Sequence, residues 1–197
     1  MEEAMQLNEC PLCFLDEAVK KMYLNRLINN VLDDGYREEW QESGGLCPEH
    51  ALLLLEHGSA TGHAILYQDL IHNWQDIWLN NKINCPVCKR LTENKQDASK
   101  AFMWGIKNAP TFKERYSTSA GLCKEHFNIV YNQADVEMQS FLITVQERAF
   151  QELNSKLTLL LRQHDYNFQG KKDPEAAKAW RKAARYWSSG VEKKWRV

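Results

Sequence analysis

All six cysteines and two of the six histidines occur in short motifs that appear twice along the 197 residues. Each copy has a C-P-x-C motif and then a G-L-C-x-x-H motif, with 33 or 34 residues between the second and third cysteines. The potential ligands are Cys10, Cys13, Cys47 and His50 in the first copy and Cys85, Cys88, Cys123 and His126 in the second. Three thiols and one imidazole form the ligand set of a closed tetrahedral zinc site, so the sequence predicts two structural zinc ions per chain.

The two copies superpose with a shift of 75 residues at the first motif and 76 at the second. The likeness extends beyond the ligands, because residues 36–40 align with residues 112–116 and Ser43 aligns with Ser119. Such self-similarity indicates an internal repeat, and duplication is its simplest origin. Because each copy must once have bound its metal alone, we expect each zinc site to use the four ligands of one copy. The alternative is a cross-braced arrangement in which the first C-x-x-C joins the second C-x-x-H.

The spacing of the ligands suggests how helices would present them. Cys47 is expected to cap a helix whose first position is Pro48, and His50 would then lie on the same face as Cys47. The C-P-x-C motif is expected to form a tight turn that places both sulfurs on one side. A Cys3His site that binds a divalent cation carries about one net negative charge, which the positive end of a helix dipole would stabilise.

The six cysteines could also serve purposes other than zinc binding. Disulfide bonds could use all six, but the acidic N-terminus has no apolar core of a secretory signal, so we expect a cytoplasmic protein with reduced thiols. Three cysteines and one histidine can also hold an iron–sulfur cluster, and this alternative stays open. A thioredoxin-like redox pair is disfavoured because neither C-x-x-C follows a predicted strand.

Composition and periodicity predict an all-α fold. The chain is 44% hydrophobic with a formal net charge of -1, and no apolar run reaches the roughly 18 residues of a membrane-spanning helix. Apolar residues recur at helical spacing through most of the sequence, including 136–163 and 174–187. We expect a duplicated helical bundle with two Cys3His zinc knuckles, divided into a first repeat at 1–83, a second repeat at 84–169 and a C-terminal helical segment at 170–197.

Residues 170–197 are basic, with nine Lys or Arg against three Asp or Glu. Interleaved with Trp180, Trp187 and Trp195, these cations could contact phosphates while the rings stack on bases, so nucleic-acid binding is one alternative. The interpretation that we favour is that the segment docks its tryptophans on the acidic remainder of the chain, because motifs of known nucleic-acid-binding modules are missing. Long apolar helices are also compatible with a homodimer.

A third motif, H-D-Y-x-F at residues 164–168, precedes the alanine-rich C-terminal helix. In its three motifs the chain resembles a prokaryotic family known only as a domain of unknown function. The residues that match this pattern are Cys10, Cys13, Cys47, His50, His164, Asp165, Tyr166 and Phe168. The resemblance implies a mostly helical fold and cysteines that bind metal, and it implies no activity.

Catalysis at the metal sites is not expected, because four protein ligands leave a zinc ion no open coordination position. Motifs of hydrolases and of nucleotide-binding loops are also missing from the sequence. Polar residues that could bind a ligand elsewhere are His57, His63, His164, Asp165 and Tyr166. We therefore expect a zinc-stabilised helical protein that binds a partner protein or a small molecule. The alternatives are a metal-dependent or iron–sulfur redox enzyme and a nucleic-acid-binding protein.

Overall fold

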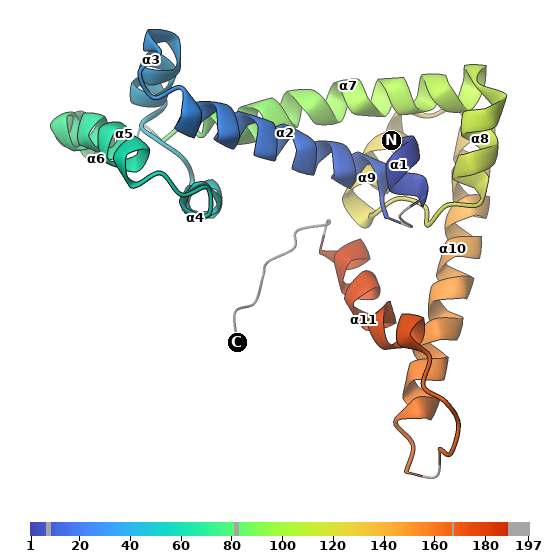
Figure 1. Ribbon diagram of the computed structural model, residues 1–197. Coiled ribbons are helices and arrows are strands. Elements are labelled where there is room, and N and C mark those ends of the chain that lie inside the picture. The colour runs from blue at the N-terminus through green and yellow to red at the C-terminus, as the bar shows by residue number, and fades with distance from the viewer. Residues whose placement is uncertain (7–8, 81–82, 167, 189–197) are drawn as a thin grey trace. The chain divides into compact units, whose positions relative to one another are not determined.

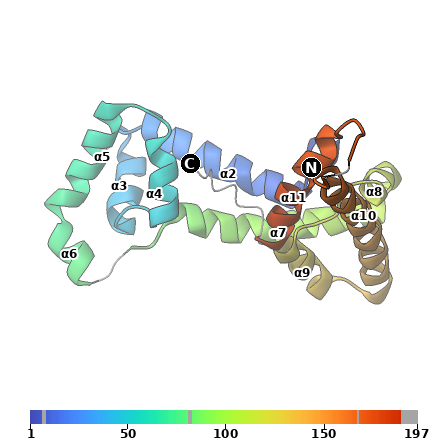
Figure 2. The same cartoon turned by 90° about the horizontal axis from the view of Figure 1, so that it is seen from below.

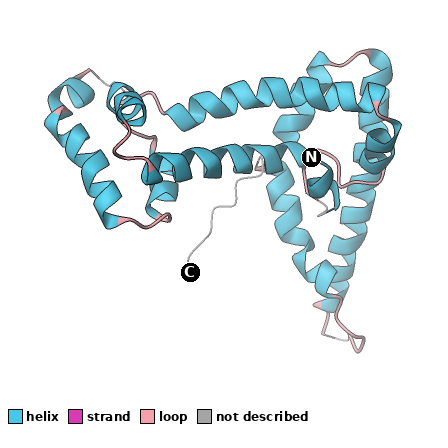
Figure 3. Cartoon of the chain, turned by 45° about the horizontal axis from the view of Figure 1, so that its top comes forward, coloured by secondary structure: helices cyan, strands magenta, loops and turns pink. Residues whose placement is uncertain are grey.

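The computed structural model describes residues 1–6, 9–80, 83–166 and 168–188. These residues form eleven helices and no strand, which confirms the expected all-α fold (Figures 1 and 3). None of these helices is long and apolar enough to span a membrane. The helices are α1 (Glu2–Gln6), α2 (Pro11–Asn29), α3 (Asp34–Ser43), α4 (Pro48–Leu55), α5 (Ala60–His72), α6 (Trp74–Leu79), α7 (Pro86–Asn108), α8 (Pro110–Ser117), α9 (Lys124–Gln133), α10 (Val136–Gln163) and α11 (Pro174–Trp187).

Several helix ends follow directly from the sequence. The predicted bounds of α10 and α11 are confirmed. The C-P-x-C motifs were expected to form tight turns, but α2 and α7 begin inside them, at Pro11 and Pro86. Proline suits the first helical position because its fixed φ is helical and its missing N–H would have no partner there. Between residues 60 and 79 the chain forms two helices, since Asn73 ends α5 and precedes α6.

The helices occur in the same order in the two copies. A long helix starts at each C-P-x-C motif (α2 and α7), a shorter one follows (α3 and α8), and each C-x-x-H motif opens the next (α4 and α9). Helices α5 and α10, which come next in the two copies, also start at matched positions, because their N-caps Ser59 and Asp135 are 76 residues apart. The repeat in helix order therefore continues beyond His50 and His126, the last residues of the matched motifs.

The chain divides into two compact units. We call residues 16–96 the central unit and residues 1–15 with 97–197 the terminal unit, after their places in the sequence. Helices α2 and α7 each start in one unit and end in the other. The units differ from the segments 1–83, 84–169 and 170–197, because those segments follow the sequence repeat whereas each unit combines parts of both copies.

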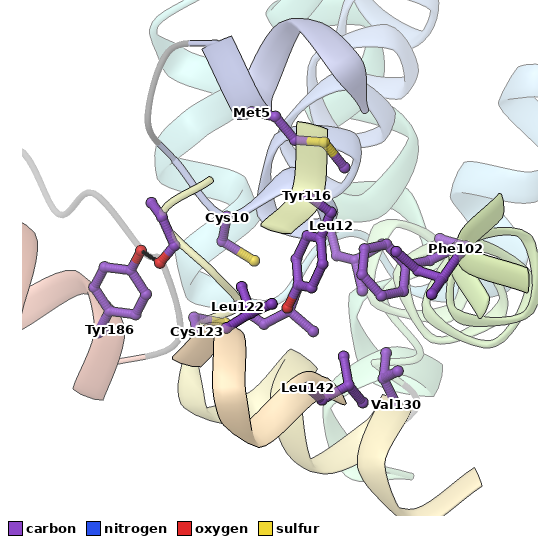
Figure 4. Close-up of a cluster of buried hydrophobic side chains, with 14 of the residues drawn as sticks. Met5, Cys10, Leu12, Phe102, Tyr116, Leu122, Cys123, Val130, Leu142 and Tyr186 are labelled. Atoms are coloured by element: carbon purple, nitrogen blue, oxygen red, sulfur yellow. Dashed lines mark hydrogen bonds between the residues drawn. The ribbon is translucent and has the colours of Figure 1, made fainter. Parts of the chain in front are cut away.

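The core of the terminal unit is rich in aromatic side chains (Figure 4). Phe102 and Tyr116 are fully buried and meet edge to face, with ring centroids 4.8 Å apart. Leu142 of α10 is buried in the same cluster, and Figure 4 shows Cys10 and Cys123 among these side chains. Aromatic pairs in this geometry add to the free energy of burial, so the core supports the cysteines that it encloses.

The core of the central unit has corresponding residues at matched positions. Trp40, Leu54 and Leu66 are fully buried, and the indole Nε1 of Trp40 donates a hydrogen bond to the Leu66 carbonyl at 2.7 Å. Figure 2 shows α3, α4, α5 and α6 grouped at the left of the view. The residues 76 positions later, all fully buried in the terminal unit, are Tyr116, Val130 and Leu142. The two units therefore use equivalent positions for their cores.

Helix α11 packs on α10, but its predicted tryptophans are only partly buried (Figure 1). Trp180 and Trp187 are 54% and 63% exposed, the ring of Trp187 contacts that of Phe150 on α10 with centroids 5.6 Å apart, and Trp195 lies outside the described residues. The buried stripe of α11 lies beside the tryptophans on the helix surface and also has helical spacing. Its two alanines let α11 and α10 approach closely. The buried residues of this stripe are Ala176, Ala179 and Tyr186.

Candidate metal centres

The eight predicted ligands form two clusters, each within a single unit. The terminal cluster consists of Cys10, Cys13, Cys123 and His126, and the central cluster of Cys47, His50, Cys85 and Cys88. In each cluster the four donor atoms lie within 4.8 Å of one another. Each cluster thus combines the C-P-x-C motif of one copy with the C-x-x-H motif of the other.

The expectation that each site uses the ligands of one copy is therefore wrong. Cys10 and Cys13 lie at the start of α2, whose 19 residues extend over about 28 Å. The helix separates these two sulfurs from the residues that follow it by about this length, and the C-x-x-H motif of the same copy belongs to the central cluster. Helix α7, with 23 residues and a length of about 35 Å, has the same effect after Cys85 and Cys88.

The separations between donor atoms match those around one tetrahedral ion. With Zn–S near 2.3 Å and Zn–N near 2.05 Å, a tetrahedron has S–S edges of about 3.8 Å and S–N edges of about 3.5 Å. The Sγ atoms of Cys13 and Cys123 are 3.4 Å apart, and those of Cys47 and Cys88 are 3.7 Å apart. These distances are too long for a disulfide bond of about 2.05 Å, and all six cysteines are free.

The imidazole nitrogens fit the same geometry. His126 Nδ1 lies 3.7, 3.3 and 3.2 Å from the sulfurs of Cys10, Cys13 and Cys123. In the central cluster His50 Nδ1 lies at a similar distance from each sulfur, namely 3.2 Å from Cys47, 3.5 Å from Cys85 and 3.4 Å from Cys88. Both histidines are almost completely buried. Each Nδ1 therefore occupies one corner of a tetrahedron whose other corners are sulfurs.

Each cluster lies at the N-terminal ends of two helices. Cys47 and Cys123 are the N-caps of α4 and α9, as predicted for Cys47. Cys10 and Cys85 directly precede α2 and α7, and their carbonyls accept the first helical hydrogen bonds. The C-P-x-C motif is therefore a helix start. Two helix dipoles direct their positive ends at each set of thiols, which favours the anionic form of the site.

The thiols alter one another's ionisation because they are in contact. Contact with the thiols of Cys10 and Cys13 lowers the pKa of Cys123, whereas contact with Cys10 and Cys123 raises the pKa of Cys13. In the central cluster burial opposes ionisation of Cys85, but hydrogen bonding with His50 and backbone groups outweighs it and lowers the pKa to about 6. Burial and the charge of Cys85 raise the pKa of Cys88 to about 12. Three thiolates in contact need a cation between them, and these donors fit one.

The turn before each C-x-x-H motif requires glycine. Gly45 and Gly121 have φ values of 97° and 76°, a conformation that other residues adopt only with strain. A Cβ atom at Gly45 would lie 2.8 Å from Leu70 of α5, and one at Gly121 would lie 2.6 Å from Gln146 Oε1 of α10. The two contacts are equivalent, since Leu70 and Gln146 are 76 residues apart. Extending the shift along the sequence pairs Leu70 with Gln146, but it does not show that these residues pack on the turns.

Helix α11 meets α9 and α10 at a cavity of about 290 Å³ in the terminal unit. Gln146 lies in its wall, and its Oε1 accepts a hydrogen bond from the Leu122 backbone N–H at 2.9 Å. The Gln146 side chain therefore holds the ligand-bearing turn against α10. The lining residues are Leu122, Lys124, Phe127, Asn128, Gln146, Phe150, Tyr186 and Trp187.

The other predicted site residues of the central unit belong to neither cluster. His57 Nδ1 is hydrogen-bonded to Asn25 Oδ1 at 2.7 Å. The ring of His63 stacks on Tyr67, and both of its nitrogens are buried without a hydrogen-bond partner among the described residues. A ligand-binding role for these two histidines stays a prediction.

The predicted site residues near the end of α10 are exposed. His164 is the C-cap of α10, a position where its charge would interact favourably with the helix dipole. Asp165 follows in a turn, and Tyr166 is fully exposed. These three residues form no enclosed site, and their role also stays a prediction.

The basic residues of α11 are partly engaged within the protein. Arg185 forms an ion pair with Glu9 at 3.1 Å, and Lys178 forms one with Glu175 at 3.1 Å. Burial lowers the pKa of Lys182 to about 8. These contacts reduce the positive charge that α11 offers to phosphates, and residues 189–197 lie outside the described part of the chain.

A sequence profile of a family of unknown function, DUF6062, matches residues 68–194, more than half of the chain. The chain belongs to the DUF6062 family. This confirms the resemblance to an uncharacterised family. The matched region of this DUF6062 protein contains the second pair of motifs, Cys85 to His126, and begins after the first pair.

The DUF6062 protein is also similar to an uncharacterised 23.9 kDa protein in the xynA 3′ region of Caldicellulosiruptor sp. (strain Rt8B.4). The two sequences are 26% identical over 199 residues, which cover 94% of this chain and 98% of the relative. No solved structure shows significant similarity to the chain. Since neither match names an activity, the function has to be inferred from the two clusters and the surface.

Proposed function

We propose that this DUF6062 protein is a helical binding protein in which two zinc ions, one in each unit, are structural. The observation that carries the proposal is the pair of Cys3His clusters whose donor atoms all lie within 4.8 Å of one another. Thiolate and imidazole donors in a tetrahedron suit zinc. An iron–sulfur cluster would place its own iron and sulfide atoms between the cysteines, whereas sulfurs here are 3.4 and 3.7 Å apart.

A structural role for the metals is supported by the closed ligand sets and by the path of the chain. Four protein donors fill a tetrahedron and leave no position for a substrate or a reactive water. The ligands also join distant segments, since Cys13 and Cys123 are 110 residues apart and His50 and Cys85 are 35 residues apart. Metal binding would thus close two long loops and contribute directly to the free energy of folding.

A binding role is supported by apolar side chains on the surface of the central unit. Trp78 and Leu79 are 74% and 77% exposed, and Ile71 is 68% exposed. Large exposed apolar patches mark interaction sites or ligand-binding grooves. Because the six thiols of the proposed sites must stay reduced to bind metal, we also place the protein in the cytoplasm.

Elemental analysis of protein purified without added metal tests the proposal. We expect two zinc ions per chain, no visible colour, and a large loss of helicity and thermal stability when a strong chelator removes the metal. Brown protein that contains iron and acid-labile sulfide would contradict the proposal and favour the redox alternative. Unchanged helicity and melting temperature after complete removal of zinc would show that the metals are not structural.

A further inference from the structure

Four large apolar side chains on three helices of the central unit are strongly exposed. They are Leu52 of α4, Ile71 of α5, and Trp74 and Trp78 of α6, which are 66%, 68%, 44% and 74% exposed. The two tryptophan rings contact each other, with centroids 5.8 Å apart. We call these four residues the exposed central face. Large apolar side chains that gather at a surface are characteristic of a site that another molecule covers.

In the terminal unit, α11 lies on the positions that match two residues of this face, Leu52 and Trp74. Trp74 and Leu52 are 76 residues before Phe150 and Asn128, and these two residues line the cavity at which α11 meets α9 and α10. Phe150 contacts the rings of Tyr186 and Trp187 of α11, at centroid distances of 5.7 and 5.6 Å. In the terminal unit an amphipathic helix therefore lies on this surface.

The exposed central face has no such cover among the described residues of its unit. The repeat of helices in the central unit ends with α6, and the chain then enters the next C-P-x-C motif at Cys85. No described helix of the central unit corresponds to α11. A helix from elsewhere would therefore be needed to bury Trp74 and Trp78 as α11 contacts Phe150.

The charge around the face indicates what kind of helix would fit. Between Arg37 and Lys82 the sequence contains seven Asp or Glu and no Lys or Arg. Asp76 lies on α6, two residues from each tryptophan in the sequence, and Glu49 lies on α4. In the terminal unit the covering helix α11 carries four Lys or Arg and one Glu. The acidic central unit would attract a basic partner of this kind.

We propose that the exposed central face binds a basic, amphipathic helix of another protein in the way that α11 packs on α10. Small and aromatic side chains of the partner would pack on Leu52, Trp74 and Trp78, and its Lys or Arg side chains would lie near the acids of α4 and α6. The proposal deepens the binding role proposed above and rests on it. It does not depend on which metal fills the two clusters.

A synthetic peptide of residues 172–188, labelled with a fluorophore, serves as a model of such a helix. Fluorescence anisotropy measures its binding to the full chain, whose zinc content is determined on the same sample. We expect saturable binding that weakens as salt rises, because part of the attraction is between opposite charges. We also expect Trp78→Ala to weaken binding at least about tenfold, as truncation of a central aromatic side chain does at many interfaces.

Two further variants locate the bound peptide. Phe150→Ala changes the matched position in the terminal unit, so it should leave the affinity unchanged if the peptide binds the exposed central face. Leu52→Ala provides a second change on that face, with circular dichroism to confirm that each variant is folded. A peptide of the same composition in scrambled order should bind much more weakly, because its apolar and basic residues no longer occupy separate faces.

Several results would overturn the inference. Absence of binding, equal binding of the scrambled peptide, or weakening by Phe150→Ala but not by Trp78→Ala would each contradict it. A homodimer that Trp78→Ala converts to a monomer would show that a second copy, and not another protein, covers the face. If the chain contains two zinc ions and the peptide fails to bind, only the inference about the face fails. Absence of metal would instead count against the proposed zinc-stabilised protein.

Discussion

Replacing Cys47 by serine tests the pairing of the ligands most directly. Cys47 belongs to the central cluster, so the variant should lose one of two zinc ions and retain the one in the terminal cluster. The proposed central metal would close a loop in which His50 and Cys85 are 35 residues apart. The chain-entropy relation for a covalent cross-link of that length gives about 4 kcal/mol, and we expect the central unit to be destabilised by about this amount.

Thiol labelling followed by mass spectrometry shows which cysteines lose their metal. In Cys47→Ser we expect Cys85 and Cys88 to react with iodoacetamide while Cys10, Cys13 and Cys123 stay protected by zinc. The matched control is Cys123→Ser, in which Cys10 and Cys13 should become reactive and the three central cysteines should not. Rapid labelling of Cys10 and Cys13 in Cys47→Ser would refute the pairing, because it would assign these residues to the same site as Cys47.

Three further predictions concern the surroundings of the sites. Gly121→Ala should lower the free energy of unfolding by about 1–3 kcal/mol, because its φ of 76° is strained for alanine and the new Cβ would meet Gln146. Chemical denaturation measures this loss. The control Gly58→Ala should lose less, because its φ is a similar 70° but nothing lies within 4 Å of the new Cβ. Asp135→Ala should cost about 1 kcal/mol in the same assay, because the side chain accepts a hydrogen bond from the Met138 N–H at the start of α10, and a loss below 0.3 kcal/mol would contradict this role. Burial lowers the pKa of Lys182 from 10.5 to about 8, so the folded state binds fewer protons than the unfolded state between these values and stability should rise with pH across that window. Lys182→Met should flatten this rise in denaturation curves measured from pH 8 to 10.5, and an equal slope in both proteins would exclude Lys182 as its source.

The local features of the metal centres were predictable because short-range spacing determines them. The eight donors were identified from two repeated motifs, and Pro48 correctly placed the start of α4 after Cys47. The period of apolar residues also gave the ends of α10 without error. Such features depend on residues a few positions apart, whose relation a helix or a turn fixes.

The pairing of the motifs was not predictable in the same way. The ligand types and spacings are the same whether Cys10 and Cys13 join the site of Cys47 or that of Cys123, so local sequence cannot distinguish the two arrangements. The path of α2 and α7 decides between them. The buried face of α11 presented a similar ambiguity, because the stripe containing Trp180 and the stripe containing Tyr186 both have helical spacing.

A chain with a single copy of the repeat could not form a metal site of this kind alone, because each site combines motifs from both copies. In this arrangement the two motifs of a copy lie at different sites, so a single copy would complete neither site by itself. Two such chains would complete both, each contributing its thiol pair to one site and its Cys–His pair to the other, which is a domain-swapped homodimer. Joining them end to end would make assembly intramolecular and would free metal binding from its dependence on protein concentration.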